Sequence, residues 1–336
     1  MRRLGLYLGR LPGFDKRGFD RAELVECVRA ADACGYDSFW LPEAWEREAF
    51  TTLTDLATHT KRIHLGTGII NIFSRSPALI AMSAATLDEI SGARFRLGLG
   101  TSGARVVEDF HGVKFNKPLM QLREAIQIIR LLLGGERVDF DGECFKLARF
   151  KLGFKPLRRE IPIYVAALSP KSLQQIGELA DGWLPTFWPS GKLEEGIAEI
   201  RAGAKDAARD PDKIEIAPFV NLVVSNDVAG ARDRARLPLA YYSGGMGDYY
   251  HRSLSRLGFG EEADRVRKLW QEGRPRDAIK AVTDEMVDAV AICGSIERCR
   301  GRLDEMSLGG ATLPIVSIPG EGSTAEKCRV IESLIV

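Results

Sequence analysis

Short apolar runs alternate with longer segments of helical period along the N-terminal third of the chain. The expected strands are residues 4–8, 38–41, 63–67 and 95–100. Helices are expected between them, and the first has a capping-box start at Asp20 and Glu23 and a glycine stop at Gly35. Each strand-like run is apolar on both faces, which indicates parallel strands covered by helices.

The same alternation continues to the C-terminus. Further strands are expected at residues 161–168, 182–187, 214–225 and 311–320, with a hairpin around Asp141 and Gly142. Residues 226–310 look mainly helical. Eight strands alternating with helices predict an α/β fold, a (β/α)8 TIM barrel. We expect one domain over residues 1–336, with a mainly helical insertion at 226–290 before the last strand.

A doubly wound sheet would show a similar alternation of strands and helices. The first strand–helix junction, LGRLPGFDKRGF, lacks the G-x-G-x-x-G pattern of dinucleotide-binding folds of that kind. The barrel is therefore the favoured architecture.

Composition narrows the class of protein. The chain has 336 residues, of which 45% are hydrophobic and 28% charged, enough for a large core and unlike a disordered chain. A net charge of +1 gives no reason to expect a nucleic-acid or anionic-membrane partner. No apolar run reaches the roughly 18 residues of a membrane span. The N-terminus is basic and then apolar, but too broken for a signal peptide, so a cytoplasmic protein is expected.

Cysteines and histidines show no metal-binding pattern. The six cysteines lie at positions 27, 34, 144, 293, 299 and 328 without a C-x-x-C pair. The four histidines lack H-x-x-x-H spacing. We expect reduced thiols and no metal site.

In a TIM barrel, catalytic and binding residues lie at the carboxyl ends of the strands, so the candidate site is expected at the ends of the predicted strands. They read LPEAW, GTGIINIFSR, GLGTSGARV, AALSPKS, WLPTFW and SIPGEG. One glycine after a strand is usually a plain turn. Together, these Gly-, Ser- and Thr-rich ends offer N–H groups and hydroxyls, which suit phosphate and heterocycle binding better than acid–base hydrolysis.

Several segments of the chain resemble those of a known family. The segments GYDSFWLPEAW, IHLGTGIINIFSRSPALIAMSAATLDEISGARFRLGLGTSG and EDFHGVKF are similar to the bacterial-luciferase-like superfamily, as are PIYVAALSPKSLQQIGELADGWLPT and GSIERCRGRLDEMSLGGA. The nearest branch is the coenzyme F420-dependent oxidoreductases, including the methylenetetrahydromethanopterin-reductase-like group. The resemblance covers nearly the whole chain, but residues 236–280 carry no motif that can be assigned to the family.

The resemblance implies an enzyme that transfers a hydride between C5 of the deazaflavin and a small organic substrate. It also implies a homodimer. Two alternatives remain open, an FMN-dependent monooxygenase of the same superfamily and a non-catalytic cofactor-binding paralogue.

Site residues follow from the resemblance one position at a time. In the family a bulge with a non-prolyl cis peptide ends the third strand and supports the deazaflavin ring. The matching bond is Gly68–Ile69, although an ordinary glycine bulge is the alternative. Asn71 matches a polar residue near the ring. Glu43 matches an acidic residue that faces the deazaflavin, and it is a weak catalytic candidate.

The other matching positions lie on later strand ends. Those expected to receive the cofactor phosphate are Leu168, Ser169, Lys171 and Ser172. Those expected to border the ring and substrate are Thr101, Ser102 and Gly103, and Thr186 matches a hydroxyl at the end of the sixth strand.

Two departures from the family leave the catalytic residues unassigned. Ala44 and Gly103 stand where some relatives have a catalytic His and a Glu proton donor. The sugar-phosphate dehydrogenase activity of those relatives is therefore not expected. His111 and Glu108 lie nearby in the sequence, but nothing in their pattern assigns them a role.

Overall fold

Parallel strands joined by helices build both compact units of the computed structural model, which describes residues 2–8, 19–318, 320 and 322–335. The central unit comprises Trp40–Leu184 and Glu199–Glu215, and the terminal unit comprises Met1–Phe39, Pro185–Ala198 and Ile216–Val336. The division falls within β2 (Ser38–Leu41), α6 (Leu193–Asp206) and β10 (Glu215–Ile216).

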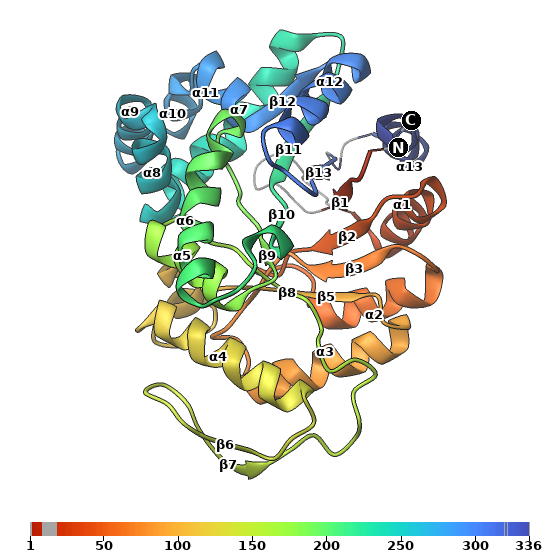
Figure 1. Cartoon of the computed structure of the whole chain (residues 1–336). Coiled ribbons are helices and arrows are strands. Elements are labelled where there is room, and N and C mark those ends of the chain that lie inside the picture. The colour runs from red at the N-terminus through yellow and green to blue at the C-terminus, as the bar shows by residue number, and fades with distance from the viewer. Residues whose placement is uncertain (1, 9–18, 319, 321, 336) are drawn as a thin grey trace. The chain divides into compact units, whose positions relative to one another are not determined.

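The central unit contains a parallel sheet in the order β9–β8–β5–β3, with the short β4 also paired to β5. Its strands are β3 (His64–Thr67), β4 (Ile70–Asn71), β5 (Phe95–Gly100), β8 (Ile163–Val165) and β9 (Gly182–Trp183). Its helices are α2 (Ala49–His59), α3 (Pro77–Ser91), α4 (Pro118–Leu133) and α5 (Pro170–Leu179), with the short helices η1 (Val106–Phe110) and η3 (Pro211–Lys213). In Figure 1, α2, α3 and α4 lie along the outside of the strands.

Helix ends in both units follow sequence rules. Asp20 and Glu23 form the expected capping box of α1 (Arg21–Cys34), and Gly35 ends that helix at a φ of 89°. Ser76 caps α3 through the N–H of Leu79. These ends confirm the helices expected from the sequence.

A hairpin follows α4, as predicted. Its strands are β6 (Val138–Asp141) and β7 (Lys146–Phe150). The buried carboxylate of Glu124 on α4 accepts hydrogen bonds from the N–H groups of Glu143, Cys144 and Phe145 at 2.7, 2.9 and 2.9 Å. One carboxylate thus fixes the turn of the hairpin to the helix.

The terminal unit holds four parallel strands in the order β1–β13–β11–β12 among the described residues. They are β1 (Gly5–Tyr7), β11 (Phe219–Val224), β12 (Ala291–Gly294) and β13 (Ile315–Ser317). The helices outside the insertion are α1, η2 (Ser190–Lys192), α12 (Ile296–Leu308) and α13 (Thr324–Ile335).

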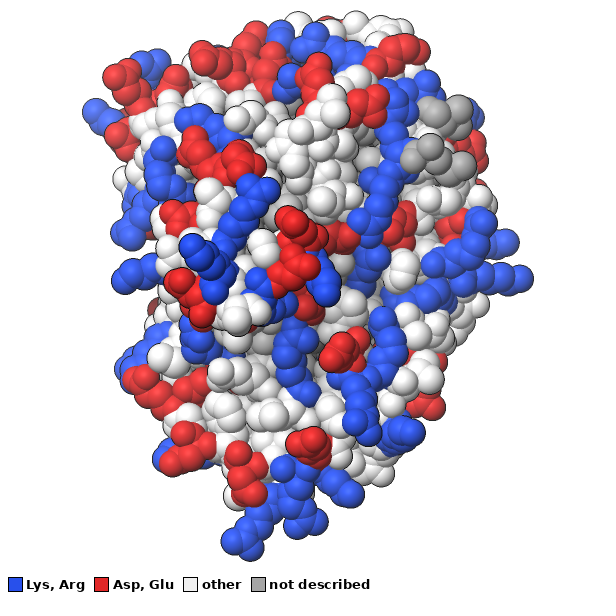
Figure 2. Space-filling view, viewed as in Figure 1, with Lys and Arg blue, Asp and Glu red and all other residues white. Residues whose placement is uncertain are grey.

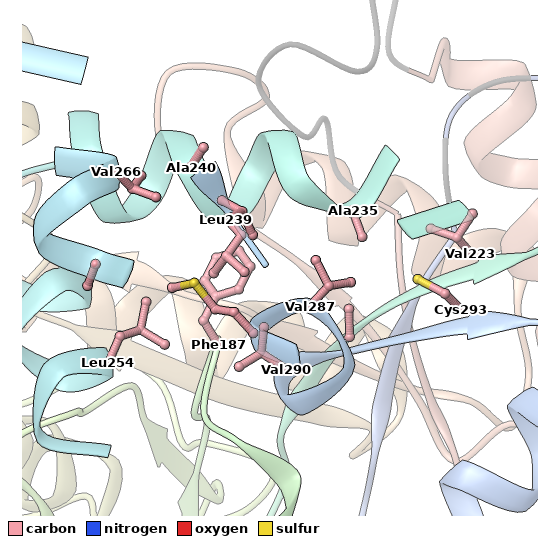
Figure 3. Close-up of a cluster of buried hydrophobic side chains, with 14 of the residues drawn as sticks. Phe187, Val223, Ala235, Leu239, Ala240, Leu254, Val266, Val287, Val290 and Cys293 are labelled. Carbon is pink, nitrogen blue, oxygen red and sulfur yellow. The ribbon is translucent and has the colours of Figure 1, made fainter. Parts of the chain in front are cut away.

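The segment predicted as an insertion is helical, and its helices share a buried apolar cluster with Phe187 and with residues of β11 and β12. Its helices are α7 (Val228–Gly245), α8 (Asp248–Leu254), η4 (Ser255–Phe259), α9 (Gly260–Gln271), α10 (Pro275–Ala281) and α11 (Asp284–Val290). Figure 3 shows Leu239, Leu254, Val266 and Val287 from different helices around Phe187. The burial of such side chains stabilises each by about 1.5–3 kcal/mol. That these residues are an insertion within a single domain stays a prediction.

Two strands, the two-residue β4 and β12, were not expected from the sequence, and two others were merged into one. β12 lies inside the segment read as mainly helical. Because α11 runs directly into it after Val290, helix and strand form one apolar run whose period cannot be read. The single strand expected at 214–225 is β10 and β11, separated by Ala217 and Pro218. Proline has no N–H for the ladder, so the strand breaks there.

The charged side chains of one face can be compared with the net charge of the sequence. On the face shown in Figure 2, positive and negative side chains are interspersed, in keeping with the net charge of +1.

Within the described residues, no helix is long and apolar enough to cross a bilayer. Over the same residues, no group of three or more His, Cys, Asp and Glu side chains could hold a metal ion. The six cysteines are free thiols.

Thr67 and Gly98 join β3 to β5 at a very short separation. The buried hydroxyl of Thr67 donates to the carbonyl of Gly98 at 2.8 Å and accepts from its N–H at 2.8 Å. A Cβ on Gly98 would overlap the carbonyl oxygen of Thr67 and lie 2.9 Å from its carbonyl carbon. Any side chain at position 98 must therefore push the two strands apart.

Gly98→Ala is expected to lower the free energy of unfolding by about 1–3 kcal/mol, because overpacking shifts backbone rather than a flexible side chain. Gly153→Ala is the matched control, since a Cβ there meets open space. We expect it to change stability by less than about 0.5 kcal/mol. Urea unfolding followed by tryptophan fluorescence measures both, and equal losses in the two variants would contradict the packing argument.

Candidate cofactor site at the strand ends

A bulge with a cis peptide bond ends β3, and it lies at Gly68–Ile69 as predicted. The N–H of Gly68 donates to the carbonyl of Leu41 at 2.7 Å, and the N–H of Glu43 donates to the carbonyl of Ile69 at 3.1 Å. On the other side, Asn71 pairs with the last residue of β5. The bulge is therefore held between the carboxyl ends of β2 and β5.

Small residues on the neighbouring strands leave room for the side chain of Ile69. A Cβ on Gly100 would lie 2.8 Å from Cδ1 of Ile69 and 3.6 Å from Cβ of Ala166. The ends of β4, β5 and β8 thus meet around one half-buried isoleucine. In this class of barrel, sites lie at the carboxyl ends of the strands.

Glu43 is fastened by an arginine that the sequence reading did not single out. Its Oε1 accepts from Nη1 of Arg75 at 2.5 Å, and its Oε2 accepts from Nη2 at 2.8 Å. Oε2 also accepts from the N–H of Ala49 at the start of α2, at 2.9 Å. The Glu43 side chain is only 10% exposed. Both oxygens are thus engaged in holding the end of β2 to α2 and to the segment after β4.

Arg75 joins three parts of the central unit. Its Nη2 also donates to Oε1 of Glu48, the N-cap of α2, at 2.5 Å, and its guanidinium lies 5.5 Å from the ring centre of Phe50. Burial lowers the pKa of Arg75, but its bonds to Glu43 and Glu48 outweigh this and raise the pKa overall. Burial likewise raises the pKa of Glu48, yet the helix N–H groups, the hydroxyl of Thr51 and Arg75 together lower it. The ion pairs are therefore maintained at neutral pH.

The loop after β5 opens into a short π-helix. Thr101, Ser102 and Gly103 are half-buried, and Ser102 has a φ of 55°. The carbonyl of Gly103 accepts from the N–H groups of Val106 and Val107 at 3.0 and 3.1 Å, which starts η1. This loop directly follows Gly100, so it borders the bulge.

Asn71 is buried, with 1% exposure, beside the bulge. Its Oδ1 accepts from the N–H of Phe73 at 3.0 Å, and its Nδ2 lies 3.1 Å from Nε2 of His111. The structure therefore brings His111, at the end of η1, to the predicted site. Glu108 is instead exposed and accepts from the N–H of Phe115 at 3.0 Å.

The predicted phosphate-binding residues form the start of α5. Ser169 is the N-cap, and its hydroxyl accepts from the N–H of Ser172 at 3.4 Å, while Ser172 Oγ accepts from the N–H of Ser169 at 3.0 Å. Leu168 is half-buried, and the side chain of Lys171 is exposed. A helix N-terminus carries partial positive charge that favours an anion.

Thr186 is the one predicted site residue that belongs to the terminal unit. There it forms a parallel bridge with Phe219. The other predicted residues all lie on strand ends of the central unit. Arg75 was missed, although it is the single cation in the strand-end segment GTGIINIFSR. His111 was noted in the family-like segment EDFHGVKF, but no role was assigned to it.

Arg75→Met is expected to lower the free energy of unfolding by about 2–3 kcal/mol, because it leaves the mostly buried carboxylate of Glu43 without its cation. Combining it with Glu43→Gln should recover part of the loss. Arg105→Met is the control, because Arg105 and Asp109 are 69% and 75% exposed and 3.9 Å apart. Such a pair contributes about 0–0.5 kcal/mol. Similar losses of unfolding free energy for the two variants in chemical denaturation would contradict the role of Arg75 in holding Glu43.

Comparison with known proteins shows the family to which the chain belongs. It matches the model of the luciferase-like monooxygenase family over residues 1–313. A Mycobacterium tuberculosis protein named as a proposed coenzyme F420-dependent oxidoreductase is 34% identical, covering 93% of this chain and 94% of the relative. The 5,10-methylenetetrahydromethanopterin reductase of Archaeoglobus fulgidus is 35% identical, with 88% and 90% covered.

A solved structure agrees in fold over almost the whole length. The coenzyme F420-dependent tetrahydromethanopterin reductase from Methanopyrus kandleri superposes with a TM-score of 0.82 at 25% identity, covering 98% of this chain and 97% of that chain. This likeness confirms the predicted (β/α)8 barrel class, and the family match over residues 1–313 confirms the resemblance seen in the sequence. The chain belongs to the luciferase-like monooxygenase family.

Proposed function

We propose that this protein is a coenzyme F420-dependent oxidoreductase that acts on a small organic substrate. The observation that carries the proposal is the bulge at Gly68–Ile69, clamped between β2 and β5 with half-buried backbone at the strand ends. The names of the two relatives that are at least 34% identical support the choice of cofactor. When bound, the deazaflavin would supply a carbon that accepts or gives a hydride.

The residues at the strand ends suit a flat heterocycle with a phosphate-bearing tail. Gly68, Ile69 and Gly103 would lie against the ring through backbone and small groups, beside Asn71 and the Thr101–Ser102 loop. The N-terminus of α5, from Leu168 and Ser169 to Lys171 and Ser172, would hold the phosphate. Glu43 would act through Arg75 by holding the bulge in place rather than by moving a proton.

The protein's role in such a reaction is alignment. The clamp between Glu43 and Arg75 fixes the bulge, so a ring resting on it keeps one orientation toward the substrate. Holding two reactants in line lowers the barrier without any covalent step by the protein. A homodimer and a cytoplasmic location stay predictions.

Oxidised coenzyme F420 is expected to bind at micromolar concentration, measured by quenching of its fluorescence. Lys171→Ala should weaken binding about three- to tenfold, because it removes a cation next to the helix N-terminus. Lys155→Ala is the matched control, since Lys155 is exposed on the segment after the hairpin. No quenching at tens of micromolar by the folded wild type would contradict the proposal.

An FMN-dependent monooxygenase is the second candidate, favoured by the description of the matching family model. FMN would use the same bulge and helix N-terminus, but its reduced form reacts with oxygen. Oxygen uptake with reduced FMN, without a response to coenzyme F420, would support this candidate. Oxidation of reduced F420 by 5,10-methylenetetrahydromethanopterin, or by a small ketone, would support the first.

A further inference from the structure

His111 occupies a specific place relative to the candidate site. Asn71 ends β4 and is aligned with Gly100, the last residue of β5. The ring of His111 is one hydrogen bond from Asn71, with Nε2 3.1 Å from Nδ2. The imidazole therefore lies where two strand ends and the loop after β5 meet.

The direction of the Asn71 amide is set by the backbone. Its oxygen accepts from the N–H of Phe73 at 3.0 Å, and a backbone N–H can only donate. The atom that faces His111 must then be the amide nitrogen. Asn71 is buried, so its side chain has little freedom to turn over.

The amide in turn sets the tautomer of the imidazole. Because Nδ2 of Asn71 can only donate, Nε2 of His111 must accept. A neutral ring then carries its single proton on Nδ1. Among the residues that the structure describes, none forms a hydrogen bond with Nδ1 of His111.

Two further contacts keep the ring in place. His111 closes the π-helix η1, where its N–H donates to the carbonyl of Val106 at 3.2 Å, and its ring meets Phe110 edge-on at 4.9 Å. Phe73 packs against Phe115 with ring centres 5.2 Å apart. The segments after β4 and after η1 are thus joined twice. Single-turn π-helices of this kind are often found at functional sites.

We propose that His111 is a hydrogen-bond donor to the substrate and that Asn71 is the positioning residue that keeps its proton on Nδ1. The inference rests on the proposed function. The substrate class is a carbonyl or imine compound, whose oxygen or nitrogen accepts from Nδ1–H while the adjacent carbon receives the hydride. The imidazole gives up no proton, because losing it would leave an anionic ring. The oxygen or nitrogen anion that hydride transfer leaves takes its proton from solvent water. A neutral imidazole can polarise an acceptor in this way.

The tautomer is measured by NMR on protein with ¹⁵N-labelled histidine, which gives four imidazole rings. His111→Gln assigns the ring of His111. We expect a protonated Nδ1 and an unprotonated Nε2. His251 is an internal reference of the opposite kind, with Nε2 2.7 Å from Oδ1 of Asp264 and Nδ1 3.3 Å from Nη1 of Arg267.

Asn71→Asp tests the role of the tautomer. One carboxylate oxygen can still accept from the N–H of Phe73, and the other can accept from Nε2–H, so the proton should move to Nε2. Turnover of a small ketone or a cyclic imine should fall about a hundredfold in kcat. This kcat is measured at saturating F420, because Asn71 lies beside the proposed ring position and its change can also weaken cofactor binding. Asn116→Asp, the same change at an exposed position, should leave the tautomer and kcat unaltered.

Each outcome decides a separate point. A wild-type His111 with its proton on Nε2 overturns the proposal, and so does an Asn71→Asp variant whose proton has moved but whose kcat is unchanged. A wild type that binds F420 but reduces neither compound counts against the donor role. A wild type that binds no F420 contradicts the proposed function and this substrate role, while the NMR result still decides the tautomer.

Discussion

The close approach of β3 to its neighbours is the constraint on which the candidate site depends. Thr67 bonds twice to Gly98, and one residue later the chain leaves the strand at the bulge. Backbone hydrogen bonds from Gly68 and to Ile69 then fasten this bulge to the end of β2. Because buried backbone groups must be paired, these bonds leave the bulge only one register.

Ion pairs add to the backbone hydrogen bonds that hold the bulge. Arg75 bonds to the carboxylates of Glu43 and Glu48 and lies over Phe50. Two carboxylates at the start of α2 also suit the positive end of the helix dipole. The arginine therefore links the bulge segment to β2 and to a helix terminus. Ion pairs with little exposure contribute mainly by specifying one arrangement, since their desolvation offsets much of their attraction.

Much of the fold was predictable from the sequence because its signals are local. The capping box at Asp20 and Glu23 and the apolar runs of the first strands need no tertiary information. β12 was not predictable, because no polar or turn residue separates it from α11. Pro218 was a visible reason to divide the long strand before β11, and it was overlooked.

The candidate site was likewise predictable from the sequence only in part. Residue patterns indicated Gly-rich strand ends, but the cis bond at Gly68 followed from resemblance to a family. The engagement of Glu43 by Arg75, and of Asn71 by His111, depends on contacts between residues 32 and 40 positions apart. No spacing rule reports such contacts, so only the folded chain reveals them.

A crystal structure with bound oxidised coenzyme F420 tests the central claim most directly. The account predicts that the deazaflavin ring lies in van der Waals contact with the Gly68–Ile69 peptide, and that the phosphate lies at the N-terminus of α5 beside Ser169. A ring bound away from the bulge, or a phosphate held by other elements, would contradict it.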